Sequence, residues 1–165
     1  MDLFELFLKN PSISTDTRTI QSGDIFFALK GDHFDGNLYI DQAIEKGAFL
    51  CVSDDQSRIG QEKVWVTNDV LTSLQDLARK YRKLLKGNVI GLTGSNGKTT
   101  TKELIYQVLS QKFKTHATKG NLNNHIGVPL TLLRVPVDAE MIIIEMGANH
   151  QGEIHDLCKI AVRFF

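Results

Sequence analysis

Apolar residues are arranged along the chain in short runs that alternate with segments of helical periodicity. The short runs, bounded by polar turns, predict buried strands. They lie at 24–29, 48–52, 64–67, 89–92, 115–117 and 141–144. Apolar residues spaced three or four positions apart predict helices, at 39–47, 70–85, 98–113, 126–133 and 152–161. Strands that alternate with helices in this order indicate an α/β fold.

The segment from Asn88 to Thr101 has the pattern of a phosphate-binding loop: a buried strand, a glycine-bearing turn and the start of a helix near Lys98. Gly94 and Gly97 can adopt backbone angles closed to other residues, so successive N–H groups can point into one concavity. The helix N-terminus adds unpaired N–H donors and a partial positive charge at the same place. The sequence therefore predicts a site for a phosphate group.

Two side chains after the loop extend this prediction to a nucleoside triphosphate with magnesium. Lys98 can reach the β and γ phosphates, and the hydroxyl of Thr99 can bind the metal ion between them. The general motif G-x-x-x-x-G-K-[ST] has glycine where this chain has Leu92, so the strict pattern fails at one position. The alternative is a glycine-rich turn before a helix that happens to begin with Lys and Thr.

A second candidate is the apolar run that ends in Glu145, which has the form of a central parallel strand delivering a carboxylate to the edge of its sheet. If this strand neighbours the loop strand, Glu145 lies beside Thr99 as a second magnesium ligand. An acid that simply ends a strand is the alternative. The polar segment 118–125 could face a polar ligand, or its asparagines could close turns.

The long predicted helix ends at Gly87, and the loop strand follows at once. We therefore place a domain boundary there. The fold class is α/β, with a small mixed-sheet α/β domain at residues 1–86 and a parallel α/β domain of P-loop type at residues 87–165.

Charge and cysteine content limit the environment and the partners. The chain has 19 Lys plus Arg and 19 Asp plus Glu, so no overall field draws it to nucleic acid or to an anionic membrane. Cys51 and Cys158 are far apart, and we expect free thiols in a reducing compartment. Residues 1–8 carry acids where a secretion signal would be basic. We expect a cytoplasmic protein with no obligate protein partner.

Several segments, in order, resemble the Mur ligase family. They are Thr15–Arg18, Gly23–Gly31, Phe34–Gly36, Leu92–Thr101, Gly120–Leu133 and Ile144–Ile154. The resemblance runs from Ser14 to Ala161. It is greatest to the members that add D-alanyl-D-alanine to UDP-N-acetylmuramoyl-tripeptide. It implies an ATP-dependent amide ligase of peptidoglycan precursor synthesis, with these two molecules as substrates and Mg²⁺ as cofactor.

The resemblance also implies roles for individual residues. The ATP phosphates would be held by Gly94, Ser95, Asn96, Gly97, Lys98, Thr99 and Thr100. Lys98 would neutralise charge and Glu145 would hold magnesium with Thr99, which makes Lys98 and Glu145 the catalytic pair. The uridine diphosphate group would lie near Asp16, Thr17, Arg18 and the Lys30–Gly31 turn. Asn121 and Asn124 would face the muramoyl and peptide end of the substrate, and Asn149 and His150 would shape the same edge.

Two other functions stay open. One is a Mur ligase that adds a diamino acid to UDP-muramoyl-dipeptide, against which the segment Gly120–Asn124 argues. The other is a nucleotide-binding module that performs no ligation. Members of the family also have a longer central domain, which supplies a carbamylated lysine and a histidine, and a third domain. We expect the central domain here to be incomplete and these residues alone to lack ligase turnover. The end Val162–Phe165 departs from the polar turn and strand of the family.

Overall fold

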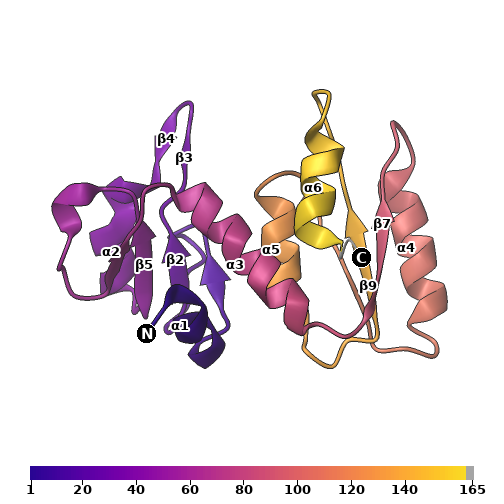
Figure 1. Cartoon of the computed structure of the whole chain (residues 1–165), viewed down its shortest axis with the longest axis horizontal. Coiled ribbons are helices and arrows are strands. Elements are labelled where there is room, and N and C mark those ends of the chain that lie inside the picture. The colour runs from indigo at the N-terminus through magenta and orange to yellow at the C-terminus, as the bar shows by residue number, and fades with distance from the viewer. Residues whose placement is uncertain (163–165) are drawn as a thin grey trace. The chain divides into compact units, whose positions relative to one another are not determined.

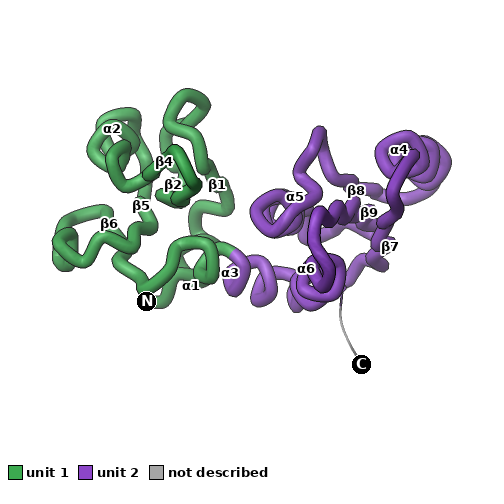
Figure 2. The backbone as a smooth tube through the Cα atoms, turned by 90° about the horizontal axis from the view of Figure 1, so that it is seen from above, with its two compact units in different colours: residues 1–74 green, residues 75–165 purple. Residues whose placement is uncertain are grey.

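The computed structural model describes residues 1–162 and forms two compact units, residues 1–74 and 75–165 (Figure 2). This division falls inside a helix, twelve residues before the boundary that the sequence suggests after Lys86. The boundary after Lys86 stays a prediction. Residues 163–165, which make up most of the atypical end noted above, lie outside the described residues.

The first unit is a small parallel sheet with a separate hairpin (Figure 1). Its elements are α1 (Leu3–Lys9), β1 (Ile13–Ser14), β2 (Ile25–Phe27), β3 (Lys30–Gly31), β4 (Phe34–Asp35), α2 (Ile40–Glu45), β5 (Leu50–Ser53) and β6 (Val64–Val66), with 3-10 turns at Gly36–Tyr39 and Gln56–Arg58. Strands β1, β2, β5 and β6 pair in parallel in the order β1-β2-β5-β6, and β3 pairs with β4 in the antiparallel direction. Lys30 and Gly31 thus form a hairpin strand rather than the expected turn.

One face of this sheet is buried under α2. Phe26 and Cys51 point from β2 and β5 into a cluster with Ile40 and Ala43 of the helix, and all four are at most 1% exposed. The helix ends before Gly47, whose φ of 93° is a left-handed conformation that glycine adopts without strain. The helix predicted over 39–47 is therefore found, and Gly47 follows its end.

The second unit has a three-stranded parallel sheet between helices. Its elements are β7 (Asn88–Leu92), α4 (Lys98–Leu109), β8 (Thr115–Ala117), α5 (Gly127–Leu133), β9 (Met141–Glu145) and α6 (Glu153–Ala161), preceded by α3 (Val70–Leu84), which crosses the boundary between the units. The strand order is β7-β9-β8, so β9 is central, as its continuous apolar run predicts. Figures 1 and 2 show α4 on one face of the sheet and α5 and α6 on the other.

Helix α4 is unusual because a lysine is its most buried residue. Lys102 is 1% exposed, whereas Leu104 and Val108 are 64% and 71% exposed. The apolar face that supports the prediction of this helix is therefore only partly covered in the described chain. No described helix is both long enough and apolar enough to cross a membrane.

Candidate functional site

The site lies at the edge of the second sheet where β7 and β9 end together. The two strands pair in parallel with Leu92 opposite Glu145, so the loop after β7 and the carboxylate at the end of β9 meet. The Thr99 hydroxyl, in the first turn of α4, donates to Glu145 Oε2 at 3.1 Å and to Oε1 at 3.3 Å. The structure thus brings together the two residues that the sequence assigns to magnesium. Their metal-binding role stays a prediction.

The loop between β7 and α4 has the backbone that its glycines permit. Gly94 has a φ of 150° and Gly97 a φ of 74°, and both angles strain residues with a side chain. The amine of Lys98 donates to the Gly94 carbonyl at 2.6 Å, which places the ammonium over the loop. The remaining loop residues named above, Ser95 and Asn96, are exposed, as is Thr100 in the helix. They are accessible to a ligand.

The hydroxyl oxygen of Thr99 and the carboxylate oxygens of Glu145 fit a magnesium ion that is bound together with a nucleotide. Mg²⁺ prefers octahedral oxygen ligands at about 2.1 Å, so adjacent ligand oxygens lie about 3.0 Å apart. The distances of 3.1 and 3.3 Å between the Thr99 hydroxyl and the Glu145 carboxylate oxygens match this spacing. Magnesium at phosphate sites takes only one or two protein ligands. Among residues 1–162 no group of three or more His, Cys, Asp or Glu side chains gathers to hold a metal.

Three residues that the sequence analysis did not assign complete the site. Asn123 donates its side-chain N–H to Glu145 Oε1 at 3.0 Å. Thr118 accepts the backbone N–H of Glu145 on its hydroxyl at 3.0 Å. Lys102 places its amine 3.9 Å from Glu145 Oε2. Thr118 and Asn123 belong to the polar segment 118–125, which the sequence analysis considered as facing a polar ligand. Lys102 follows Thr99 by three positions, and residues three apart on a helix share a face.

The other residues assigned to this edge occupy its loops. Asn124 uses its side-chain oxygen to accept the N–H groups of Ile126 and Gly127, at 3.1 and 2.9 Å, at the start of α5. These hydrogen bonds agree with the alternative in which the asparagines of this segment close turns. They use the side-chain oxygen of Asn124. Asn121 is exposed, and its carbonyl accepts the N–H of Asn123.

Asn149 and His150 lie in the loop between β9 and α6 and are exposed. Their backbone N–H groups donate to Glu153 Oε2 at 2.7 and 3.1 Å. These two hydrogen bonds, His150 first, hold the pKa of Glu153 below its usual value. The side chains of both residues stay accessible.

In the first unit, the assigned residues follow the carboxyl ends of neighbouring parallel strands. Asp16 and Arg18 come after β1 and form an ion pair of 2.6 Å. The hydrogen bond from the Arg18 side chain lowers the pKa of Asp16 from 3.8 to about 2. Thr17 between them is buried, and its carbonyl accepts the Lys46 amine at 2.7 Å. These contacts fix the conformation of the loop after β1.

Lys30, after β2, forms an ion pair of 2.9 Å with Asp54, which follows β5. This contact raises the pKa of the Lys30 amine. The two residues line a polar cavity of about 470 Å³ together with Asp35, Asn37, Leu38, Asp55, Gln56 and Arg58. Gly31 is exposed in β3 beside it.

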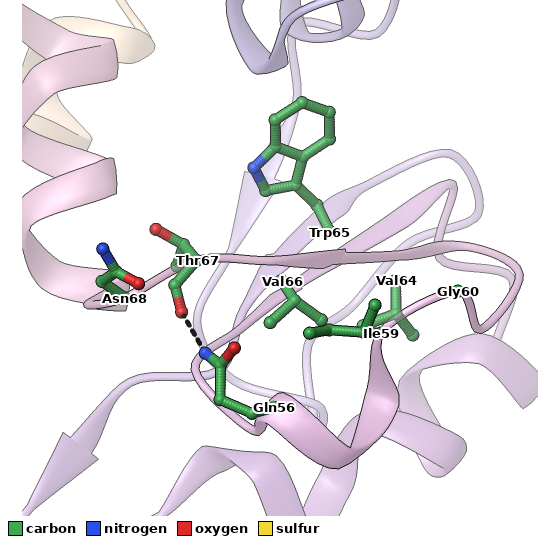
Figure 3. Close-up of a pocket in the computed structure, with 8 residues that line it drawn as sticks. All are labelled: Gln56, Ile59, Gly60, Val64, Trp65, Val66, Thr67 and Asn68. Carbon is green, nitrogen blue, oxygen red and sulfur yellow. Dashed lines mark hydrogen bonds between the residues drawn. The ribbon is translucent and has the colours of Figure 1, made fainter.

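A second cavity of about 380 Å³ runs along β6 (Figure 3). Its lining is mostly apolar and consists of Gln56, Ile59, Gly60, Val64, Trp65, Val66, Thr67 and Asn68. Gln56 donates to the Thr67 carbonyl across it. None of the assigned residues lines this cavity, and it lacks charged side chains, so it is a poorer site for a phosphorylated ligand.

Comparison with known proteins matches both units to one family. A model described as the Mur ligase family, catalytic domain, matches residues 11–85, and a model of the Mur ligase middle domain matches residues 92–165. The chain belongs to the Mur ligase family. The α/β fold class expected from the sequence is thereby confirmed, because solved Mur ligases superpose on this chain. The four-stranded sheet of the first unit is parallel, however, rather than mixed as expected. MurF from Acinetobacter baumannii matches with a TM-score of 0.84 and 40% identity over 91% of this chain.

Two similar Mur ligases from different organisms have the same name. The UDP-N-acetylmuramoyl-tripeptide--D-alanyl-D-alanine ligase of Bacillus subtilis is 44% identical over 151 residues, which is 90% of this chain and 33% of that protein. The enzyme of the same name from Synechocystis is 45% identical over 152 residues, 34% of its length. MurF ligase from Thermotoga maritima, solved in complex with ADP, covers 98% of this chain with a TM-score of 0.83 and 34% identity. The chain spans about a third of the length of these Mur ligases.

Proposed function

We propose that this chain forms the nucleotide-binding and UDP-substrate-binding part of an ATP-dependent ligase. The ligase joins D-alanyl-D-alanine to UDP-N-acetylmuramoyl-tripeptide. The observation that carries the proposal is the meeting of Thr99 and Glu145 at the mouth of a glycine-bearing loop. The names of the similar Mur ligases supply the substrate class.

The residues at this edge suit the first step of amide ligation, in which a carboxylate becomes an acyl phosphate. A free carboxylate cannot be attacked by an amine, because oxide is too poor a leaving group. Transfer of the γ-phosphoryl group of ATP to the carboxylate oxygen, with ADP as the leaving group, gives the acyl phosphate. The amine then attacks the acyl carbon, phosphate leaves and the nitrogen loses a proton. Both steps concentrate negative charge between the substrate and the nucleotide.

The chain supplies positive charge and donors where this charge develops. Lys98 lies over the loop, and its ammonium would transfer its hydrogen bond from the Gly94 carbonyl to a phosphate oxygen. The N-terminus of α4 and the loop N–H groups add further donors. Bound magnesium, held by Thr99 and Glu145, would neutralise phosphate charge.

The loops of the first unit are assigned to the uridine diphosphate group. Arg18 is 86% exposed at its side chain although it is paired with Asp16, so its free N–H groups can reach an anion. Lys30 is 49% exposed at the rim of the polar cavity. Both cations lie at the carboxyl edge of the sheet, where parallel α/β sheets bind ligands.

A binding experiment on residues 1–165 tests the proposal. We expect a fluorescent ATP analogue to bind in the presence of Mg²⁺ and UDP-N-acetylmuramoyl-tripeptide to bind in preference to UDP-glucose. Lys98→Met should weaken binding of the ATP analogue about 10- to 100-fold, since it removes charged hydrogen bonds. Lys112→Met, which removes an exposed lysine beyond the other end of α4, is the matched control.

Two results would overturn the proposal. One is equal loss of binding in the Lys98 and Lys112 variants, which would place the nucleotide elsewhere. The other is nucleotide binding without any preference for the muramoyl substrate, which would favour a nucleotide-binding module with no ligase role.

A further inference from the structure

Lys102 is buried directly behind the proposed magnesium ligands. Its amine, on a residue only 1% exposed, donates to the Thr118 carbonyl at 2.6 Å and lies 3.0 Å from Glu103 Oε1. It is also 3.9 Å from Glu145 Oε2. A lysine is rarely buried so completely unless its charge is paired. The positive charge of the Lys102 amine can stabilise the Thr118 carbonyl, the Glu103 carboxylate or the Glu145 carboxylate.

The Glu145 carboxylate is buried as well and also needs partners for its charge. Its residue is 2% exposed, and a buried carboxylate loses hydration that only hydrogen bonds and an opposite charge can replace. Asn123 donates to Oε1 at 3.0 Å, and the backbone N–H of Glu145 is fixed on the Thr118 hydroxyl. Lys102 is the cation on the Oε2 side. The carboxylate is thus held at both oxygens and at its backbone.

The two contacts from α4 reach the same carboxylate from different environments. Thr99 is an exposed residue in the first turn, and Lys102 is a buried residue one turn later. A ligand at the loop can therefore reach the Thr99 hydroxyl, whereas the Lys102 amine is enclosed and donates to the Thr118 carbonyl. Both residues are nearest to Oε2 of the carboxylate.

We propose that Lys102 is a positioning residue for Glu145. It holds this carboxylate in place, oriented toward Thr99, so that the pair can receive the magnesium of a bound nucleotide. The inference rests on the proposed function, because it assigns Glu145 to that metal. Lys102 acts through Glu145 and touches neither the nucleotide nor the metal. Residues that hold a metal-binding carboxylate in place commonly change metal affinity 10- to 100-fold when they are replaced.

The experiment measures how strongly Mg²⁺ increases affinity for a fluorescent ADP analogue. The dissociation constant is determined for residues 1–165 with excess Mg²⁺ and with EDTA, and the ratio of the two constants is the metal effect. In Lys102→Met we expect this ratio, the metal effect, to fall about 10- to 100-fold, because the metal is bound more weakly. The dissociation constant in EDTA should stay within about twofold of the value for the original protein. Glu103→Gln, which removes the exposed partner of the same amine, should leave both constants unchanged.

A double variant keeps the test decisive if Lys102→Met alone does not fold, since it leaves Glu145 as a buried charge with fewer partners. Lys102→Met with Glu145→Gln removes both charges. If Lys102 acts through Glu145, this double variant and Glu145→Gln alone must show the same metal effect.

Each outcome has a distinct meaning. If the unaltered protein shows no metal effect, the assignment of Glu145 and the proposed function fail together. If it shows one and Lys102→Met retains it, only the inference fails. If Lys102→Met weakens binding equally with Mg²⁺ and with EDTA, the lysine has a general structural role and the inference is overturned.

Discussion

The hydroxyl of Thr118 offers a sharp test of how the site is held together, because one atom can be removed with almost no change of shape. Thr118 is 2% exposed, and its hydroxyl is the acceptor for the backbone N–H of Glu145 at 3.0 Å. Its own contact to the Ile143 carbonyl is long, at 3.5 Å. That carbonyl keeps the Thr118 backbone N–H as a partner at 2.9 Å. In Thr118→Val, therefore, the Glu145 N–H is the group that loses its partner.

The expected loss of stability follows from this one N–H group without an acceptor. A buried donor without an acceptor costs about 1–3 kcal/mol, and the methyl group that replaces the hydroxyl recovers part of this by transfer to an apolar site. We expect the second unit to lose about 1–2 kcal/mol of unfolding free energy. For a unit of this size, such a loss lowers the melting temperature by about 4–8 °C per kcal/mol.

Hydrogen exchange measured by mass spectrometry reports this loss locally. Peptides from β9 should exchange about 5- to 30-fold faster in Thr118→Val, because 1–2 kcal/mol corresponds to that factor in the opening equilibrium. Thr131→Val is the matched control. Thr131 is also 2% exposed, but its hydroxyl only donates to the Leu122 carbonyl at 3.4 Å. Equal exchange rates in the two variants would refute the argument that the Glu145 amide depends on Thr118.

Three further predictions concern other groups. Thr99→Val should reduce the Mg²⁺-dependent gain in nucleotide affinity about tenfold or more, since it removes a hydroxyl ligand; an unchanged gain in a binding titration would exclude it as a ligand. Asp16 should titrate at about 2 by NMR, and at a higher pH in Arg18→Gln, which removes the side-chain hydrogen bond and keeps the one from the backbone N–H. Because the folded pKa is the lower one, the stabilisation by this pair is complete above pH 3.8 and lost as the pH falls through about 2; an unshifted titration in the variant would contradict this. Burial raises the pKa of the Cys51 thiol to about 12, so iodoacetamide at pH 8 should label the half-buried Cys158 first and Cys51 only after unfolding.

Most helices and strands could be predicted from the sequence, because each depends on the pattern of apolar and polar residues within its own segment. The helix of α3 is predicted from its apolar period. In the structure Asp69 precedes it, and its carboxylate accepts the N–H of Thr72 at 2.6 Å. The central position of β9 follows from its continuous apolar run. The hairpin at Lys30 was missed because strands of two residues carry too little pattern to detect.

For the site, the sequence by itself determined the loop. Gly94, Gly97, Lys98 and Thr99 lie within one short segment, and their chemistry depends on backbone angles and helix geometry that neighbouring residues fix. The sequence also determined that Glu145 ends a buried strand.

Only the tertiary structure decided what surrounds that carboxylate. Thr99 and Glu145 are 46 residues apart, and they meet because β7 pairs with β9 in a register that aligns their ends. Lys102 on an amphipathic helix and Asn123 in a polar loop look like solvent-facing residues until the sheet is assembled. The burial of Lys102 and the contact of Asn123 with Glu145 depend on which strand lies beside which, and strand order is set by the packing of the whole unit rather than by any one segment.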